Sequence, residues 1–254
     1  MIDSIANFAG GGIQYRRILM KLSGGAIAGD GTWGFDPTAL NHIADEILQL
    51  HQAGIQVGVM VGGGNIFKGE LGEKWGIERA EADNIGMMAT VVNSLLLRGV
   101  LQARGDAEVR VMTAIPINTV AEPFIRLRAI RHLDHEAIVV LAAGTGNPYV
   151  TTDYPAVQRA LELRADALLA AKNGTDGIYT SDPRRDPGAR RYHTISYATV
   201  IGRNLRVLDQ AAGLLARDHH LPIHVFDFDA PEAMLQICQG AHIETRIGEE
   251  DILE

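Results

Sequence analysis

The chain has 254 residues, of which 46% are hydrophobic and 21% are charged, and its formal net charge is −8. These values indicate a folded globular protein, and the acidic balance argues against a broad nucleic-acid-binding surface, which is normally basic. No run approaches the roughly 20 apolar residues of a membrane span. One cysteine, Cys238, excludes an internal disulfide and suits a reducing compartment. We therefore expect a cytoplasmic protein that contacts neither nucleic acid nor membrane.

Short apolar strands alternate with amphipathic helices along the sequence. The expected elements, in chain order, are strand 17–22, helix 37–54, strand 55–64, helix 83–105, strand 108–115, helix 122–135, strand 137–144, helix 154–165, strand 166–172, helix 208–220, strand 222–228 and helix 231–240. This alternation predicts an α/β fold with a mainly parallel sheet covered by helices on both faces. Residues 1–14 lack the features of a signal peptide, and we expect a flexible extension before one domain at 15–254.

The segment 180–196 is the longest irregular stretch, and it is rich in charge, proline and turn residues. Its arginines, Arg184, Arg185, Arg190 and Arg191, make it locally basic. Two interpretations stay open at this point. The segment is either a solvated surface loop or a loop that closes over an anionic nucleotide.

Three glycine-rich turns follow predicted strands: KLSGG at 21–25, VGGGN at 61–65 and GTGNP at 144–148. In parallel sheets, ligands bind beyond the carboxyl ends of the strands. Glycines there can present backbone N–H groups to phosphate oxygens without interference from a Cβ atom. No Walker A string and no convincing dinucleotide fingerprint occurs, so the pattern indicates phosphate binding of another kind.

Four charged residues near these turns each allow a structural and a functional interpretation. Lys21 ends the first strand, and it is either a surface lysine or the cation that neutralises a transferring phosphoryl group. Asp83 and Asp153 precede helical stretches and could cap them, or they could contact ligand hydroxyls and phosphates. Asp182 could open a turn before a proline.

Other chemistry has little support in the sequence. The nine histidines show no metal-ligand spacing, no G-x-S-x-G string occurs, and Cys238 lies in an apolar helix where a core position is expected.

Six strings of the sequence carry a family resemblance: KLSGG, VGGGNIFKG, ADNIGMMATVVN, AEPFIRLRAIRHL, AAGTGNPYVTTD and AKNGTDGIYTSDP. Taken together, they resemble those of bacterial uridylate (UMP) kinases, a branch of the amino acid kinase superfamily. The resemblance covers about residues 15–247. It implies a single three-layer αβα domain, usually assembled as a homohexamer. It also implies transfer of the ATP γ-phosphoryl group to UMP in pyrimidine nucleotide synthesis, with activation by GTP and inhibition by UTP.

The resemblance also assigns site residues by motif. Lys21 and Asp153 are implied to act in catalysis, and Mg²⁺ is implied to be held mainly by the nucleotide phosphates. The implied ATP-binding residues are Lys21, Leu22, Ser23, Gly24, Gly64, Lys68, Asn173, Tyr179 and Asp182. The implied UMP-binding residues are Gly63, Asp83, Thr145, Gly146, Asn147, Pro148, Tyr149, Val150, Thr151 and Thr152.

Several positions depart from the family pattern, which suggests a divergent member. Gly25 stands in place of an acid, Lys68 in place of a phosphate-binding arginine, and Tyr154-Pro155 in place of small residues. The motif around Glu136-Ala137 and the ending IETRIG at 243–248 also differ. One alternative is a paralogue that phosphorylates a different acceptor, and another is a nucleotide-binding or storage assembly without turnover. We expect Tyr154 to influence the choice of acceptor.

Overall fold

The computed structural model describes residues 12–172, 174–183, 185–205 and 207–253. Within these residues, ten strands form one sheet in the order β10-β7-β9-β8-β6-β1-β2-β5-β3-β4. The strands are β1 (Arg17–Leu22), β2 (Gln56–Val61), β3 (Val109–Thr113), β4 (Glu122–Pro123), β5 (Ile138–Ala142), β6 (Ala167–Lys172), β7 (Tyr192–Ser196), β8 (Ile223–Asp227), β9 (Thr245–Gly248) and β10 (Ile252–Leu253). Neighbouring strands run parallel except for β8 with β9 and β7 with β10.

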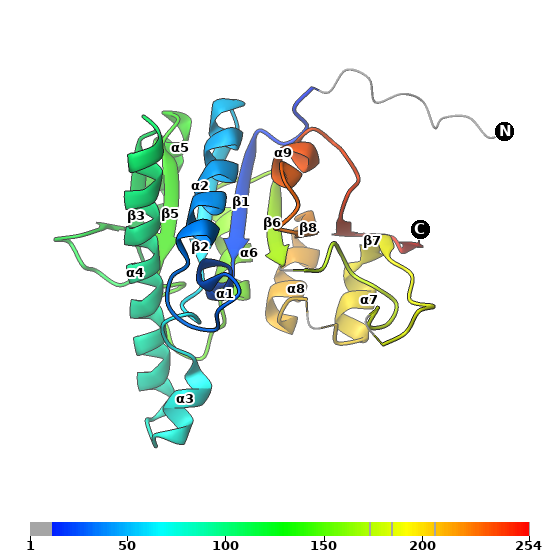
Figure 1. The fold of residues 1–254 in the computed structure, drawn as a ribbon, viewed down its shortest axis with the longest axis horizontal. Helices are drawn as coiled ribbons and strands as arrows, with labels where there is room; N and C mark the ends of the chain where they lie inside the picture. The colour runs from blue at the N-terminus through cyan, green and yellow to red at the C-terminus, as the bar shows by residue number, and fades with distance from the viewer. Residues whose placement is uncertain (1–11, 173, 184, 206, 254) are drawn as a thin grey trace.

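Helices cover both faces of this sheet (Figure 1). They are α1 (Gly24–Ala28), α2 (Pro37–Gln52), α3 (Gly69–Lys74), α4 (Arg79–Arg104), α5 (Arg126–Asp134), α6 (Asp153–Glu162), α7 (Tyr197–Gly202), α8 (Gln210–Asp218) and α9 (Ala233–Cys238). Buried side chains of α2, α4 and α9 pack on one face, and those of α5, α6, α7 and α8 pack on the other. The predicted three-layer αβα fold with a mainly parallel sheet is therefore confirmed.

The central strands are buried almost completely, as the sequence predicted for a sheet covered on both sides. In β5 every residue is buried, and in β2 only the first residue is partly exposed. Cys238 is also buried, and burial raises the pKa of its thiol to about 12. The prediction that this cysteine belongs to the core is confirmed.

Several predicted boundaries and elements were wrong. The long helix α4 begins at Arg79, four residues before the predicted start, so Asp83 lies in its second turn and does not cap it. The predicted helix 122–135 divides into strand β4 and helix α5, because Glu122 and Pro123 pair with the edge of β3. Part of the predicted irregular segment 180–196 forms β7.

Helix α4 is long and apolar enough to cross a membrane by length and composition. In the fold it packs against α2, β3 and β5, so the core accounts for part of its apolar character. Of the predicted N-terminal extension, residues 1–11 lie outside the described part of the chain. The division of the chain into this extension and one domain stays a prediction.

Candidate active site

The three glycine-rich turns lie at one edge of the sheet, because they follow the adjacent parallel strands β1, β2 and β5. Glycine is required at two of these positions by close approach of the backbones. A Cβ atom at Gly24 would lie 2.5 Å from the backbone nitrogen of Gly64, and one at Gly63 would lie 2.6 Å from the carbonyl oxygen of Gly86. The first turn is therefore packed directly on the second, and the second on helix α4.

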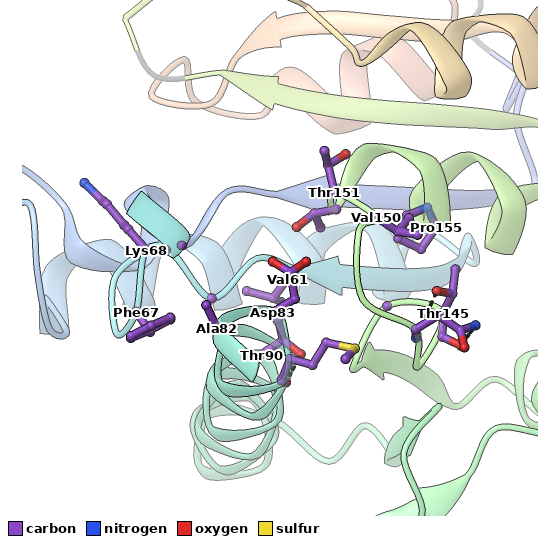
Figure 2. Close-up of a pocket in the computed structure, with 18 of the residues that line it drawn as sticks. Val61, Phe67, Lys68, Ala82, Asp83, Thr90, Thr145, Val150, Thr151 and Pro155 are labelled. Atoms are coloured by element: carbon purple, nitrogen blue, oxygen red, sulfur yellow. Dashed lines mark hydrogen bonds between the residues drawn. The ribbon is translucent and has the colours of Figure 1, made fainter. Parts of the chain in front are cut away.

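Two clefts open beside these turns, and they share Gly64 and Lys68 in their walls. The first, the α4 cleft, has a volume of about 360 Å³ and lies between the N-terminal half of α4 and the loop 144–152 (Figure 2). The second, the α1 cleft, has a volume of about 720 Å³. It is lined by the turn Ser23–Gly25, the following loop, His42 and residues after β8.

Lys21 and Asp153 form an ion pair, although neither residue is in the wall of the two clefts. Lys21 Nζ lies 2.7 Å from Asp153 Oδ1, and their side chains are only 12% and 19% exposed. Lys21 precedes Ser23 of the α1 cleft by two residues, and Asp153 directly follows Thr152 of the α4 cleft. The pair therefore places a cation and a carboxylate close in the chain to residues of both cleft walls.

Asp153 does not cap α6, contrary to one of its predicted roles. Thr152 is the N-cap residue, and Asp153 is the first residue of the helix. Its other carboxylate oxygen accepts a hydrogen bond of 3.2 Å from the backbone N–H of Asp209, the residue that caps α8. Asp209 in turn accepts a hydrogen bond from the hydroxyl of Thr151. The carboxylate is therefore held by a lysine and by the start of a second helix.

A second lysine, which the sequence reasoning missed, lies in the same region. Lys172 ends β6, the other neighbour of β1, and its ammonium donates a hydrogen bond of 3.1 Å to the carbonyl of Val207. Burial lowers the pKa of Lys172, the nearby charge of Lys21 lowers it further, and Asp153 partly opposes both effects. Lysines at the ends of adjacent strands could have indicated such a cluster.

Asp83 connects helix α4 to the opposite wall of the α4 cleft. Its carboxylate forms an ion pair with Arg79 at 2.9 Å and accepts a hydrogen bond of 2.8 Å from the backbone N–H of Tyr149. Figure 2 shows the Asp83 carboxylate directed into the cleft, below Thr151. A ligand hydroxyl in the cleft could therefore reach a carboxylate that the protein already orients.

A buried pair of amides, also missed from the sequence, fixes the second glycine turn. Asn93 of α4 donates hydrogen bonds of 2.7 Å to the carbonyl of Gly62 and to Asn65 Oδ1. Asn65 returns a bond to Asn93 and donates another to the carbonyl of Gly34. Because both amides are buried and fully bonded, they hold the turn against α4.

Most of the residues predicted to bind a nucleotide line one of the clefts. Those in the wall of the α4 cleft are Gly63, Gly64, Lys68, Asp83, Thr145, Asn147, Val150, Thr151 and Thr152. Those in the wall of the α1 cleft are Ser23, Gly24, Gly64 and Lys68. Lys68 Nζ lies 5.1 Å from the centre of the Trp33 ring, a cation–π contact at the boundary between the clefts.

Other predicted residues lie elsewhere. Among the residues that the structure describes, the walls of the two clefts do not include Lys21, Leu22, Gly146, Pro148, Tyr149, Tyr179 or Asp182. Leu22 is fully buried in the core, whereas Tyr149 is 67% exposed. Asp182 opens the predicted turn, since its carbonyl accepts bonds from Arg185 and Asp186. Asn173 lies outside the described residues.

The expected role of Tyr154 in acceptor choice stays a prediction. Pro155 lines the α4 cleft, whereas Tyr154 lines an adjoining groove with Asp209, Gln210 and Ala211, and this groove shares Val150 and Thr151 with the α4 cleft. The ring packs against the apolar cluster beneath α6 and α8. The reason is the helix itself, because adjacent residues on α6 project in different directions.

Within the described residues, no group of three or more histidine, cysteine, aspartate or glutamate side chains is placed to hold a metal ion. The cleft walls contain Asp83 in the α4 cleft and Asp30 and Asp229 in the α1 cleft, and Asp153 is already paired with Lys21. A divalent cation would therefore depend mainly on ligand phosphates for its coordination.

The chain is similar to known proteins over most of its length. The model of the amino acid kinase family matches residues 16–227. The chain is 57% identical to the uridylate kinase of Frankia casuarinae, with 92% of this chain and 90% of that protein covered, and 48% identical to that of Xanthomonas campestris, with 92% and 97% covered. The structure of UMP kinase from Bacillus anthracis matches with a TM-score of 0.92 at 54% identity, covering 94% of this chain and 99% of that one. This chain therefore belongs to the amino acid kinase family, in its uridylate kinase branch.

Proposed function

We propose that this protein is an ATP-dependent kinase that phosphorylates UMP to UDP. Its relatives named uridylate kinase and the UMP kinase structures support this function. The observation that carries it furthest is the ion pair of Lys21 and Asp153, at 2.7 Å, whose members are close in the chain to residues of two clefts that share Gly64 and Lys68. Transfer between two substrates needs this arrangement, because the two reacting phosphates must meet beside a cation.

We assign ATP to the α1 cleft and UMP to the α4 cleft. The backbone amides of Ser23–Gly25 and Gly64 suit phosphate groups, because no Cβ atom keeps the phosphate oxygens away from Gly24, Gly25 or Gly64. In the α4 cleft, Asp83 would accept hydrogen bonds from the ribose hydroxyls of UMP, and the loop 144–152 would surround the base. This loop contains no lysine or arginine, so it is suited to an uncharged base and sugar.

In the proposed reaction, the bond between the γ-phosphorus and its bridging oxygen to ADP breaks, and a bond to a phosphate oxygen of UMP forms. Lys21 stabilises the negative charge on the transferred group, while Asp153 holds Lys21 in place. Mg²⁺, bound mainly to the nucleotide phosphates, would supply further charge neutralisation. The reaction requires no covalent enzyme intermediate, because positioning and charge stabilisation carry phosphoryl transfer.

We also propose a cytoplasmic homo-oligomer, a homohexamer by family resemblance, that acts in pyrimidine nucleotide synthesis and responds to GTP and UTP. Exposed apolar side chains support an interface between subunits: Met88 and Val92 lie one turn apart on α4 and are 43% and 47% exposed. Light scattering on a size-exclusion column tests this proposal. We expect the measured mass to be a multiple of the 27.4 kDa chain mass. In Val92→Glu we expect a smaller measured mass, because the charge disrupts the apolar interface.

The proposed activity is tested by ADP release with UMP, CMP, dTMP and aspartate as separate acceptors. We expect kcat/KM for UMP to exceed that for each other acceptor by at least about tenfold, since a site that hydrogen-bonds its substrate discriminates strongly. Clear turnover of another acceptor without turnover of UMP would refute the proposed substrate. Nucleotide binding without any ADP release would refute the proposed activity.

A further inference from the structure

Arg159, on helix α6, is a buried arginine whose guanidinium contacts three different parts of the chain. The residue is 7% exposed. One nitrogen donates a hydrogen bond of 3.1 Å to the carbonyl of Gly144, and another lies 2.5 Å from a carboxylate oxygen of Glu162. The guanidinium carbon lies 3.8 Å from the centre of the Phe124 ring. A buried cation with these partners has a defined position, which a surface arginine does not.

The carbonyl that Arg159 holds belongs to the first residue of the loop 144–152. Ala143 and Gly144 both have left-handed backbones, with φ values of 60° and 54°. This conformation is uncommon for alanine and needs support from its surroundings. The support comes from both layers of helices. Thr90 of α4 accepts a hydrogen bond of 2.7 Å from the N–H of Ala143, and Arg159 of α6 donates to the carbonyl of the next residue.

The position of this turn decides where the rest of the loop lies. Gly144 and Thr145 are in the wall of the α4 cleft, and the N–H of Gly146 returns to the carbonyl of Ala143 at 2.8 Å. Thr90 lines the same cleft. Arg159 itself is not among the residues of that wall, so it reaches the cleft only through Gly144.

The ion pair with Glu162 makes this arrangement possible. A buried guanidinium without a carboxylate would be strongly unfavourable, and Glu162 lies one helical turn away on α6. Phe124 covers the other side of the guanidinium, and its own N–H is fixed at 2.9 Å to the carbonyl of Thr113 at the end of β3. The guanidinium is therefore fixed by Glu162 and Phe124, and its second terminal nitrogen donates to the carbonyl of Gly144.

We propose that Arg159 is a positioning residue that holds the start of the loop 144–152 in the shape that binds the phosphate acceptor. It acts through the Gly144 carbonyl and touches neither substrate. The kinetic part of this inference rests on the proposed UMP kinase function, and the structural part does not.

The kinetic experiment compares Arg159→Met with the parent and with Arg217→Met, which removes an exposed arginine of α8. We expect the KM for UMP to rise about tenfold in Arg159→Met while the KM for ATP changes less than about twofold. In Arg217→Met both constants should stay at the parent values. Equal rises in both KM values, or a UMP KM within twofold of the parent, would overturn the proposal.

A second variant separates positioning from loss of stability. Arg159→Met leaves the Glu162 carboxylate, which is 27% exposed, without its cation and should lower the melting temperature. The double variant Arg159→Met with Glu162→Gln removes that isolated charge. We expect it to regain most of the melting temperature while the UMP KM stays high. Recovery of both quantities would show that Arg159 only stabilises the fold and would overturn the proposal.

Hydrogen exchange without nucleotide tests the structural part independently of the activity. In the double variant we expect amides of residues 143–149 to exchange at least about tenfold faster than in the parent, with β6 unchanged. Unchanged exchange in this segment would overturn the positioning role, whichever acceptor the enzyme uses. Faster exchange in a protein that does not phosphorylate UMP would keep the positioning role and refute only the proposed substrate.

Discussion

The two clefts of this protein are built in different ways. The wall between them and the floor of the α1 cleft are made of glycine backbones in contact, since Gly24 leaves no room for a Cβ atom against Gly64. The α4 cleft depends on side chains from distant elements: Asp83 and Thr90 of α4 and, behind the loop, Arg159 of α6. A phosphate site can be built from short-range backbone geometry, whereas a base-and-sugar site needs long-range contacts.

The largest effect should come from filling the glycine contact that both clefts share. In Gly24→Val the new Cβ atom would meet Gly64 and Asn65 at 2.5–2.8 Å, so the two turns must separate. We expect kcat/KM for both substrates to fall at least about 100-fold, equal to about 2.7 kcal/mol. The matched control is Gly99→Ala on α4, which lines neither cleft and whose Cβ atom meets nothing within 4 Å, so it should cost less than about threefold. Similar losses of kcat/KM in both variants would show that the close contact between Gly24 and Gly64 is not required for activity.

A smaller and more selective effect is expected from Asp83→Asn. The variant loses the charge that pairs with Arg79 and weakens the acceptor of the Tyr149 N–H. We expect the KM for UMP to rise about tenfold and the KM for ATP to stay within about twofold, because only the α4 cleft is changed. Glu81→Gln, an exposed change on the same helix, serves as the control. A larger change in the KM for ATP than in that for UMP would contradict the assignment of the clefts.

The smallest effect is expected at Tyr154, which lines not the α4 cleft itself but an adjoining groove that shares Val150 and Thr151 with it. In Tyr154→Leu the ratio of kcat/KM for UMP to that for CMP should stay within about twofold of the parent. A shift in this ratio of more than tenfold would show that the ring influences acceptor choice after all. The measurement therefore shows whether recognition of the acceptor extends beyond the α4 cleft to Tyr154.

The sequence predicted those parts of the site that depend on local patterns. Strand periodicity and the glycines at strand ends located the turns at 21–25, 61–65 and 144–148, and Lys21 was found from its place beside the first. The long-range partners could not be found in this way. Thr90 bonds a residue 53 positions later, and the strand β4 exists only because β3 lies beside it.

Errors at helix starts had the same origin. Asp83 and Asp153 both precede or begin apolar helical runs, which made capping a reasonable expectation for each. In the fold, however, the Asp83 carboxylate pairs with Arg79 and accepts a hydrogen bond from the N–H of Tyr149. The Asp153 carboxylate pairs with Lys21 and accepts a hydrogen bond from the N–H of Asp209. A carboxylate near a helix start is therefore assigned correctly only when its partners from other elements are known.

The central claim is that Lys21 stabilises the transferred phosphoryl group between the two clefts. The most direct test is the kcat of Lys21→Ala with saturating ATP and UMP, compared with Lys74→Ala, an exposed lysine of α3. We predict that Lys21→Ala lowers kcat by about 100- to 1,000-fold, equal to roughly 2.7–4 kcal/mol, and that Lys74→Ala leaves it unchanged. A kcat for Lys21→Ala within about threefold of the parent would contradict the account.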